Sequence, residues 1–238
     1  MLFKKKKKIA SRAPRDHYSV SAITRRTAYL RKRADDFLNS KEKIYETTTK
    51  AQLIEPFLKE LGWDTSDPTV ASFEVTAGDK NKADVMLWKN KAVKVVIEAK
   101  ATGTDLDDPK YHKQLAGYFE HCHASIGILT DGVFYEFFSY SQDSEEKMCL
   151  VPFAKIDVRR LRLSERNAFL LDLCEPNLDI DHLVRLSRVH FTYAKLGIKR
   201  KKLSLSDRKV RDAFVRDFPE CTPQDIDELI GFANYHCR

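Results

Sequence analysis

The stretch that decides the fold is Val93–Lys100, which reads VKVVIEAK. Its first five residues include a β-branched run that is typical of a buried strand. Because side chains alternate along a strand, Glu98 and Lys100 are expected on one face, while Ala99 points into the packing on the other. The stretch therefore predicts a buried strand that ends in a carboxylate and an ammonium group on the same face.

A second strand-like run, Asp84–Trp88, lies shortly before the first one. Lys89-Asn90-Lys91 between the two runs is predicted to form a tight turn, so the runs can pair antiparallel. Asp84 and Glu98 would then lie at one end of adjacent strands. Two carboxylates this close need a cation between them, and oxygen ligands suit Mg²⁺ or Mn²⁺. The pair therefore predicts a divalent-cation site.

Gln114 and Tyr118 stand four residues apart and are predicted to share one face of a helix. Together with Asp84 and the Glu98-Ala99-Lys100 segment, this pair resembles the PD-(D/E)xK nuclease superfamily with its Gln-x-x-x-Tyr extension. One departure is visible, because Ala83 stands where the superfamily name has proline. Many members lack that proline, so the departure puts little in doubt.

Two flanking segments extend the likeness. Residues 46–63 (ETTTKAQLIEPFLKELGW) resemble the opening of the nuclease domain at the N-terminus of type I restriction enzyme R subunits. Residues 126–138 (IGILTDGVFYEFF) are similar to the hairpin that closes that domain. The resemblance covers roughly residues 44–155 and implies a restriction-endonuclease-like α/β fold, with a mixed sheet flanked by helices.

The resemblance also implies an activity, the hydrolysis of phosphodiester bonds in nucleic acid, chiefly DNA, with Mg²⁺ or Mn²⁺ as cofactor. Asp84 and Glu98, with the carbonyl of Ala99, would hold the metal. Lys100 would position the attacking water or stabilise developing charge. The catalytic residues implied in this way are Asp84, Glu98, Lys100, Gln114, Tyr118 and Glu46, the last as holder of a metal-bound water.

Simpler interpretations stay open for single residues and for the whole domain. A Glu-x-Lys pair is common on a solvated strand face, and Glu46 is equally an ordinary first-turn glutamate that favours the helix dipole. A non-catalytic nucleic-acid-binding module, or a subunit of a DNA-processing complex, is the alternative function. A lost carboxylate or lysine would indicate such a module, and none of these residues is lost.

Positive charge is concentrated at the start of the chain. Residues 1–33 contain twelve Lys or Arg and one Asp, a net charge of +11, whereas the remaining residues have a net charge of −4. This arm is either a solubilising tail or a surface for phosphates, where each contact releases counterions. A second basic cluster lies in the C-terminal region and has the same two interpretations. The predicted nucleic-acid-binding residues are Lys4, Lys5, Lys6, Lys7, Lys8, Arg25, Arg26, Arg31, Lys32, Arg33, Lys199, Arg200, Lys201 and Lys202.

Changes in charge and pattern, together with helix-breaking and capping residues, predict three parts of the chain. They are a basic arm that ends in a helix (1–43), a nuclease core (44–155) and an all-helical C-terminal lobe (156–238). In the core, Asp108-Pro109 is predicted to start the helix of Gln114 and Tyr118. In the lobe, helix caps are predicted at Ser164, at Asp179 or Asp181, at Ser206 and at Thr222-Pro223.

Composition limits the remaining possibilities. No apolar run approaches the ~18 residues of a membrane helix, so no membrane partner is expected. Five cysteines without C-x-x-C spacing favour free thiols in a reducing cytoplasm. The chain contains no G-x-x-x-x-G-K-[ST], so any DNA-translocating motor is expected to be a separate protein. A stand-alone nuclease in a defence or mobile-element setting, self-associating or not, is the main expectation.

Overall fold

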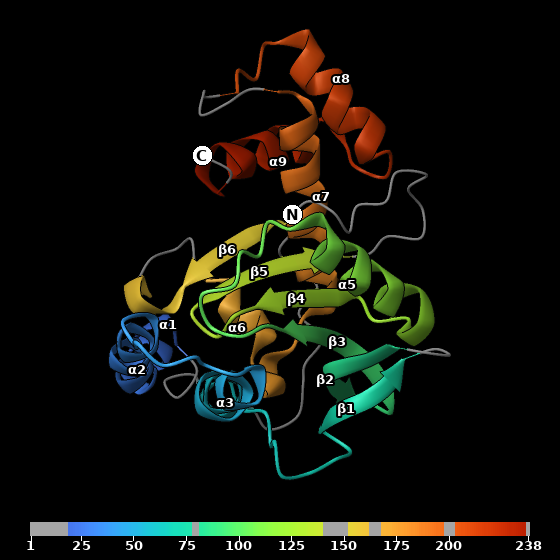
Figure 1. The fold of residues 1–238 in the computed structure, drawn as a ribbon. Helices are drawn as coiled ribbons and strands as arrows, with labels where there is room; N and C mark the ends of the chain where they lie inside the picture. Colours follow the sequence, from blue (N-terminus) through green and yellow to red (C-terminus); the bar gives the residue numbers. More distant parts are fainter. Residues whose placement is uncertain (1–18, 78–80, 140–151, 162–167, 198–202, 237–238) are drawn as a thin grey trace. The chain divides into compact units, whose positions relative to one another are not determined.

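The computed structural model describes residues 19–77, 81–139, 152–161, 168–197 and 203–236. They form a mixed six-stranded sheet with helices, which confirms the predicted fold class. The strands lie in sequence order, and each neighbouring pair is antiparallel except β3 and β4, which are parallel (Figure 1). The strands are β1 (Ala71–Ala77), β2 (Asn81–Lys89), β3 (Ala92–Ala99), β4 (Ile126–Thr130), β5 (Phe134–Ser139) and β6 (Ala154–Asp157).

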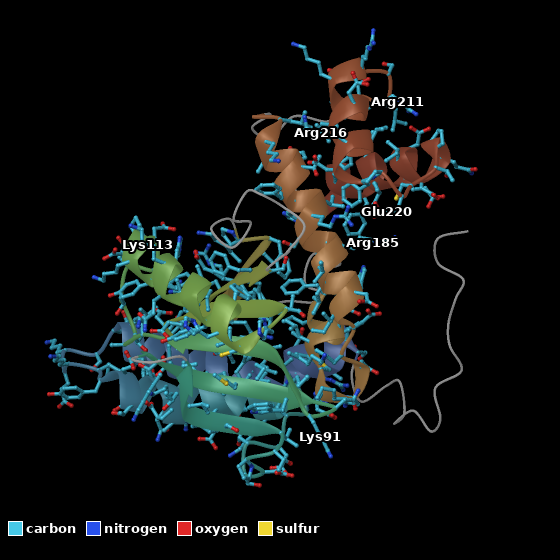
Figure 2. All side chains as sticks on the ribbon, turned by 90° about the vertical axis from the view of Figure 1, so that its right-hand side faces the viewer. Lys91, Lys113, Arg185, Arg211, Arg216 and Glu220 are labelled. Carbon is cyan, nitrogen blue, oxygen red and sulfur yellow. The ribbon has the colours of Figure 1, made fainter. Side chains whose placement is uncertain are left out.

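The β2–β3 hairpin confirms the antiparallel pairing predicted from the sequence. Its turn is made by Asn90 and Lys91, whose φ angles are 54° and 61°, as the primed turns of two-residue hairpins require. Lys91 is labelled at this turn in Figure 2. The hairpin pairs Val85 with Ile97, so the next step of the register places Asp84 opposite Glu98.

Helix α5 (Pro109–Cys122) connects the two parallel strands and begins as predicted. The carboxylate of Asp108 accepts a hydrogen bond from the N–H of Lys110 at 3.0 Å, and Pro109 follows at the first helical position. The helix lies close to β4, because a Cβ atom on Gly127 would come within 2.5 Å of the Phe119 ring. A glycine is therefore needed where helix and strand meet.

The two faces of the sheet pack against different helices. On one face, Phe138 of β5 belongs to the buried cluster that contains Phe119 of α5. On the other face, Phe57 of α4 (Glu55–Glu60) lies with its ring centroid 4.6 Å from that of Tyr135. Phe169, just before α6 (Leu170–Leu173), contacts Phe137 on the same face at 5.0 Å. Alternation along β5 thus supplies both layers of the core.

The basic arm ends in helices that belong to the same compact unit as the sheet. They are α1 (Val20–Arg26) and α2 (Ala28–Leu38), two helices where the sequence predicted one at the end of the arm. Ala34 of α2 is fully buried and forms a cluster with Leu53 and Val133. The second half of the predicted arm is therefore part of the folded unit.

The helical segment that opens the predicted core runs through α3 (Glu46–Thr49), a π-helical turn η1 (Lys50–Ile54) and α4. Pro56 has no N–H, so it cannot give the carbonyl of Gln52 the usual helical hydrogen bond. Arg33 donates to that carbonyl instead, at 3.2 Å. The π turn lies directly before Pro56 and gives way to α4. Gly62, with φ of 89°, ends the segment.

The compact unit that contains the sheet extends past residue 155, the end predicted for the nuclease core. After η3 (Val158–Arg160), the segment with α6 and η5 (Glu175–Asn177) is tied to α4 and its end. The indole of Trp63 donates to the carbonyl of Leu173 at 3.0 Å, and the N–H of Glu175 donates to the carbonyl of Leu61 at 3.0 Å. The unit therefore ends at Val184.

A second compact unit begins at Arg185, inside α7 (Ile180–Lys195), and contains α8 (Arg208–Asp217) and α9 (Pro223–His236). Its core includes Val189, Phe214 and Ile230. The basic side chains Arg211 and Arg216 of α8 are labelled in Figure 2. No helix in the described ranges is long and apolar enough to cross a membrane.

The predicted helix starts of the C-terminal region are confirmed in part. Asp179, one of two predicted caps, accepts from the N–H of His182 at 3.0 Å, and α9 starts at the predicted Thr222-Pro223 pair. The prediction for α8 is wrong by one residue, because the carboxylate of Asp207 rather than Ser206 accepts the N–H of Lys209. Ser164 lies outside the described residues.

Candidate active site

Three carboxylates lie at one level of three adjacent strands. The registers of β1–β2 and β2–β3 place Asp84 between Glu74 and Glu98. Glu98 and Asp84 are buried, with 1% and 6% of their surfaces exposed, whereas the side chain of Glu74 is half-exposed. The structure thus brings together the two predicted carboxylates, Asp84 and Glu98, and adds Glu74 beside them.

Both oxygens of Asp84 have partners. Its Oδ2 accepts a hydrogen bond from the N–H of Ala99 at 2.8 Å, which ties β2 to the end of β3. Its Oδ1 accepts one from the ammonium group of Lys50, also at 2.8 Å. Asp84 is therefore held by the backbone on one side and by a positive charge on the other. The role predicted for the carbonyl of Ala99 stays a prediction.

Glu98 is held less completely. Its Oε1 forms an ion pair with Lys100, the lysine predicted from the strand alternation. Its buried Oε2 has no hydrogen-bond partner among the described residues. Burial raises the pKa of Glu98 to about 7, and the charge of Asp84 adds to this, while the hydrogen bond from Lys100 opposes it. The hydroxyl of Tyr118 also lowers the pKa of Glu98, so it lies near this carboxylate. That hydroxyl donates to the carbonyl of Lys82, which leaves Oε2 of Glu98 as the oxygen that a cation could take.

Lys50 is a residue of this cluster that the sequence reasoning missed. Besides Asp84, its ammonium group pairs with Glu74 and lies 3.7 Å from Glu46. Burial lowers the pKa of Lys50, but hydrogen bonds and charges from Asp84 and Glu74 outweigh it and raise that pKa. Its position four residues after Glu46 on a predicted helix is the signal that points to it.

Glu46, predicted as holder of a metal-bound water, lies close to this cluster. Burial raises its pKa, and so do the charges of Asp84 and Glu74, whereas Lys100 and Lys50 lower it. Its pKa therefore responds to two members, Asp84 and Glu74, of the carboxylate row formed by Glu74, Asp84 and Glu98. The role predicted for Glu46 stays a prediction.

Glu74, the second missed residue, has an unusual backbone. Its φ angle is 53° within β1, in the left-handed region that non-glycine residues seldom adopt. Such strain persists only where the surroundings fix it, and it is found mainly at functional sites. The sequence gives no direct signal for it, because Ser72 to Val75 reads as an ordinary strand.

Gln114 and Tyr118 form a buttress for the start of β2. The amide of Gln114 donates to the hydroxyl of Tyr118 at 2.8 Å, and that hydroxyl donates to the carbonyl of Lys82 at 2.7 Å. Burial, with a contribution from Glu98, raises the pKa of Tyr118. This geometry fits a supporting role for the pair, and the catalytic role predicted for Gln114 and Tyr118 stays a prediction.

Further contacts fix Lys100 and the loop after it. The ammonium group of Lys100 lies 4.8 Å from the ring centroid of Tyr111, which the sequence analysis did not single out. The hydroxyl of Thr49 lies 3.0 Å from that of Thr102 and accepts the N–H of the same residue. Asp131 accepts the N–H of Gly103 at 2.9 Å. Loop and helix are therefore connected directly beside the site.

The donor set fits a hard divalent cation. Mg²⁺ usually takes one or two carboxylates and completes its shell with water and substrate oxygens. Asp84 and the unpartnered Oε2 of Glu98 match that pattern. Within the described part of the chain, no group of three or more Asp, Glu, His or Cys residues is arranged to hold a metal. The ammonium groups of Lys50 and Lys100 pair with the two carboxylates.

The predicted nucleic-acid contacts divide into three sets. Arg25 and Lys32 are exposed on α1 and α2. Arg26, Arg31 and Arg33 already bond within the protein, to Glu60, to the carbonyl of Thr24 and to that of Gln52. Lys4 to Lys8 and Lys199 to Lys202 lie outside the described residues. Their contacts with nucleic acid stay predictions.

Residues 46–153 match the family model described as type I restriction enzyme R protein N terminus. The matched segment starts at Glu46 and contains the whole carboxylate row with Lys50, Lys100, Gln114 and Tyr118. No curated protein and no solved structure gives a match. The match confirms, over residues 46–153, the predicted resemblance to the N-terminal domain of type I restriction enzyme R proteins, and it suggests a nuclease-related role.

Proposed function

We propose that this chain is a nuclease that hydrolyses phosphodiester bonds of DNA and depends on Mg²⁺ or Mn²⁺. One observation carries the proposal: a buried Glu98 with an unpartnered oxygen lies beside Asp84 and bears Lys100 on its other oxygen. A buried carboxylate oxygen without a partner is costly, so its presence supports a functional role for Glu98. The family match supports hydrolysis of nucleic acid as that function.

Each residue has a defined task in this proposal. Asp84 and Glu98, with the carbonyl of Ala99, hold the cation, which when bound would polarise the scissile phosphate and lower the pKa of a water. The N–H of Ala99 keeps the carboxylate of Asp84 in place. Lys100 presents its ammonium group where negative charge develops on the phosphate.

Supporting residues keep this arrangement rigid. The Gln114–Tyr118 pair holds the backbone of Lys82, two residues before Asp84. Tyr111 lies against the ammonium group of Lys100 and limits its movement. Rigid positioning matters because small displacements of reacting groups reduce rates strongly.

A second candidate is a non-catalytic module that binds nucleic acid. The contact between Lys50 and Asp84 favours it, because an ammonium group already neutralises that carboxylate. Both candidates agree with the family match, and only the first requires cleavage. The proposed biological setting is defence or a mobile element. Self-association of the chain and a separate motor protein as partner are further parts of the proposal.

The test is a cleavage assay with supercoiled, linear and single-stranded DNA and with RNA, in the presence of Mg²⁺, Mn²⁺ or a chelator. We expect cation-dependent cleavage of DNA that falls at least ~100-fold in Asp84→Ala, Glu98→Ala and Lys100→Ala proteins. Lys59→Ala, an exposed lysine on α4, is the control and should cleave normally. Unchanged cleavage by a folded Asp84→Ala protein, or binding without cleavage by the wild type, would refute the assignment.

A further inference from the structure

We propose that Lys50 is a built-in counterion of the candidate metal centre, which leaves Asp84 when a divalent cation binds and is then kept by Glu74 and Glu46. The inference deepens the proposed function and rests on Asp84 as a cation ligand. It predicts a change in the affinity for a divalent cation, which can be measured without any cleavage.

Lys50 and a bound cation would compete for one oxygen atom of Asp84. The Oδ2 of Asp84 is used by the N–H of Ala99, so Oδ1 is the oxygen that faces the site, and Lys50 occupies it at 2.8 Å. A bound Mg²⁺ would lie at about 2.1 Å from such an oxygen. Two positive charges this close repel each other strongly in a partly dry site. Cation and ammonium therefore exclude each other at Oδ1.

The contact between Lys50 and Asp84 is strong enough to affect cation affinity. The side chains of Lys50 and Asp84 are 13% and 8% exposed, so water screens their charges only weakly. Hydrogen bonds between ionised groups are also roughly twice as strong as neutral ones. A cation that enters the site has to replace this contact, which lowers its apparent affinity.

Lys50 has two other carboxylates within reach, those of Glu74 and Glu46. Its ammonium group already pairs with Glu74 and lies 3.7 Å from Glu46. The flexible four-carbon stem of lysine lets the charge move while the backbone stays fixed. The backbone at this point is fixed by Thr49, whose hydroxyl is bonded to Thr102. Lys50 can therefore leave Asp84 without any movement of the helix.

Contact with Lys50 accounts for the strained backbone of Glu74. Its φ of 53° is maintained in the middle of a strand, where an ordinary conformation would be available. The conformation places its carboxylate on the same ammonium group that Asp84 holds. Glu74 is half-exposed and carries less desolvation cost than Asp84, so it suits a carboxylate that keeps a lysine next to the site.

The experiment measures binding of Mn²⁺ to the full chain by titration calorimetry, with no nucleic acid present. Lys50→Met removes the competing charge and keeps the length of the side chain. We expect it to bind Mn²⁺ about tenfold more tightly than the wild type, since loss of one charge-assisted hydrogen bond corresponds to about one order of magnitude. Lys59→Met removes a lysine from another i,i+4 pair, that with Glu55, and should leave the affinity unchanged.

A second variant separates the role of Glu74 from direct ligation. Glu74→Gln should weaken Mn²⁺ binding about threefold in the wild-type background, because Lys50 then stays on Asp84, and should have no effect in the Lys50→Met background. Equal weakening in both backgrounds would mean that Glu74 binds the cation itself, which overturns its role as the receiver of Lys50.

Several results would overturn the role of Lys50. The first is unchanged or weaker Mn²⁺ binding by a folded Lys50→Met protein. If Lys50→Met does not fold, the same result with Lys50→Gln counts equally. The last is absence of Mn²⁺ binding in all proteins. The proposed function fails separately, if wild-type protein binds Mn²⁺ with the expected dependence on Lys50 and cleaves no nucleic acid.

Discussion

Replacing Glu98 with Gln is expected to stabilise the cation-free protein at about pH 8 and to have little effect at about pH 4.5. Burial raises the pKa of Glu98 from 4.5 to about 7. The folded state therefore binds this proton more tightly than the unfolded state, and ionisation of Glu98 costs stability as the pH rises through 7. Glutamine resembles the protonated acid and does not ionise.

The magnitude follows from the pKa difference. At ~1.4 kcal/mol for each unit, the shift from 4.5 to about 7 corresponds to about 3 kcal/mol above the folded-state pKa. Below the unfolded-state value both proteins carry a neutral group and the difference disappears. Because the ion pair with Lys100 is already part of the pKa, no further correction for it is needed.

The assay is urea unfolding in the presence of a chelator, followed by tryptophan fluorescence at both pH values. The two tryptophans of the chain, Trp63 and Trp88, lie in the compact unit that also contains Glu98, so the signal reports on that unit. Glu42→Gln, at an exposed position, is the matched control and should not change the pH dependence. If Glu98→Gln shows the same stability as the wild type at about pH 8, the burial argument is refuted.

Three further changes have outcomes that follow from single contacts. Gly127→Ala should destabilise the protein by about 1–3 kcal/mol in thermal unfolding, because its Cβ would meet the Phe119 ring; an unchanged melting temperature would contradict the close contact. Tyr118→Phe should cost about 0.5–1.5 kcal/mol in urea unfolding through the lost bond to Lys82, and no loss would mean that the buttress is not needed. Removal of the first fifteen residues, which carry seven Lys or Arg, should weaken DNA binding by the Glu98→Ala protein for all sequences alike and flatten its salt dependence. An unchanged slope would show that these charges do not contact phosphates.

Local signals in the sequence predicted the elements that need no distant partner. The β-branched run before Glu98, the Asn90-Lys91 turn and the Asp108-Pro109 helix start all depend on neighbouring residues, and the structure confirms them. The pairing of Asp84 with Glu98 followed from the same short hairpin. Interactions between residues a few positions apart determine these elements, so the local sequence pattern predicts them.

The missed features depend on contacts between distant segments. Lys50 joins the site through ion pairs with Glu74 and Asp84, which lie 24 and 34 residues further along the chain. Glu74 joins it through a strained φ that its neighbours in the sequence do not indicate. Strand β6 was missed because Ala154–Asp157 is short and its pairing partner is β5. The extension of the first unit to Val184 rests on contacts such as that of Trp63 with Leu173.

The carboxylate row lies entirely within one antiparallel meander, β1–β2–β3, whose strands follow each other along residues 71–99. Contacts between segments close in sequence form faster than those that need long loops to close. The meander can therefore assemble before the α5 crossover brings in β4, and Glu74, Asp84 and Glu98 come together at that stage. Like-charge repulsion at this step should slow refolding, so the refolding rate should rise when salt or a divalent cation screens the row.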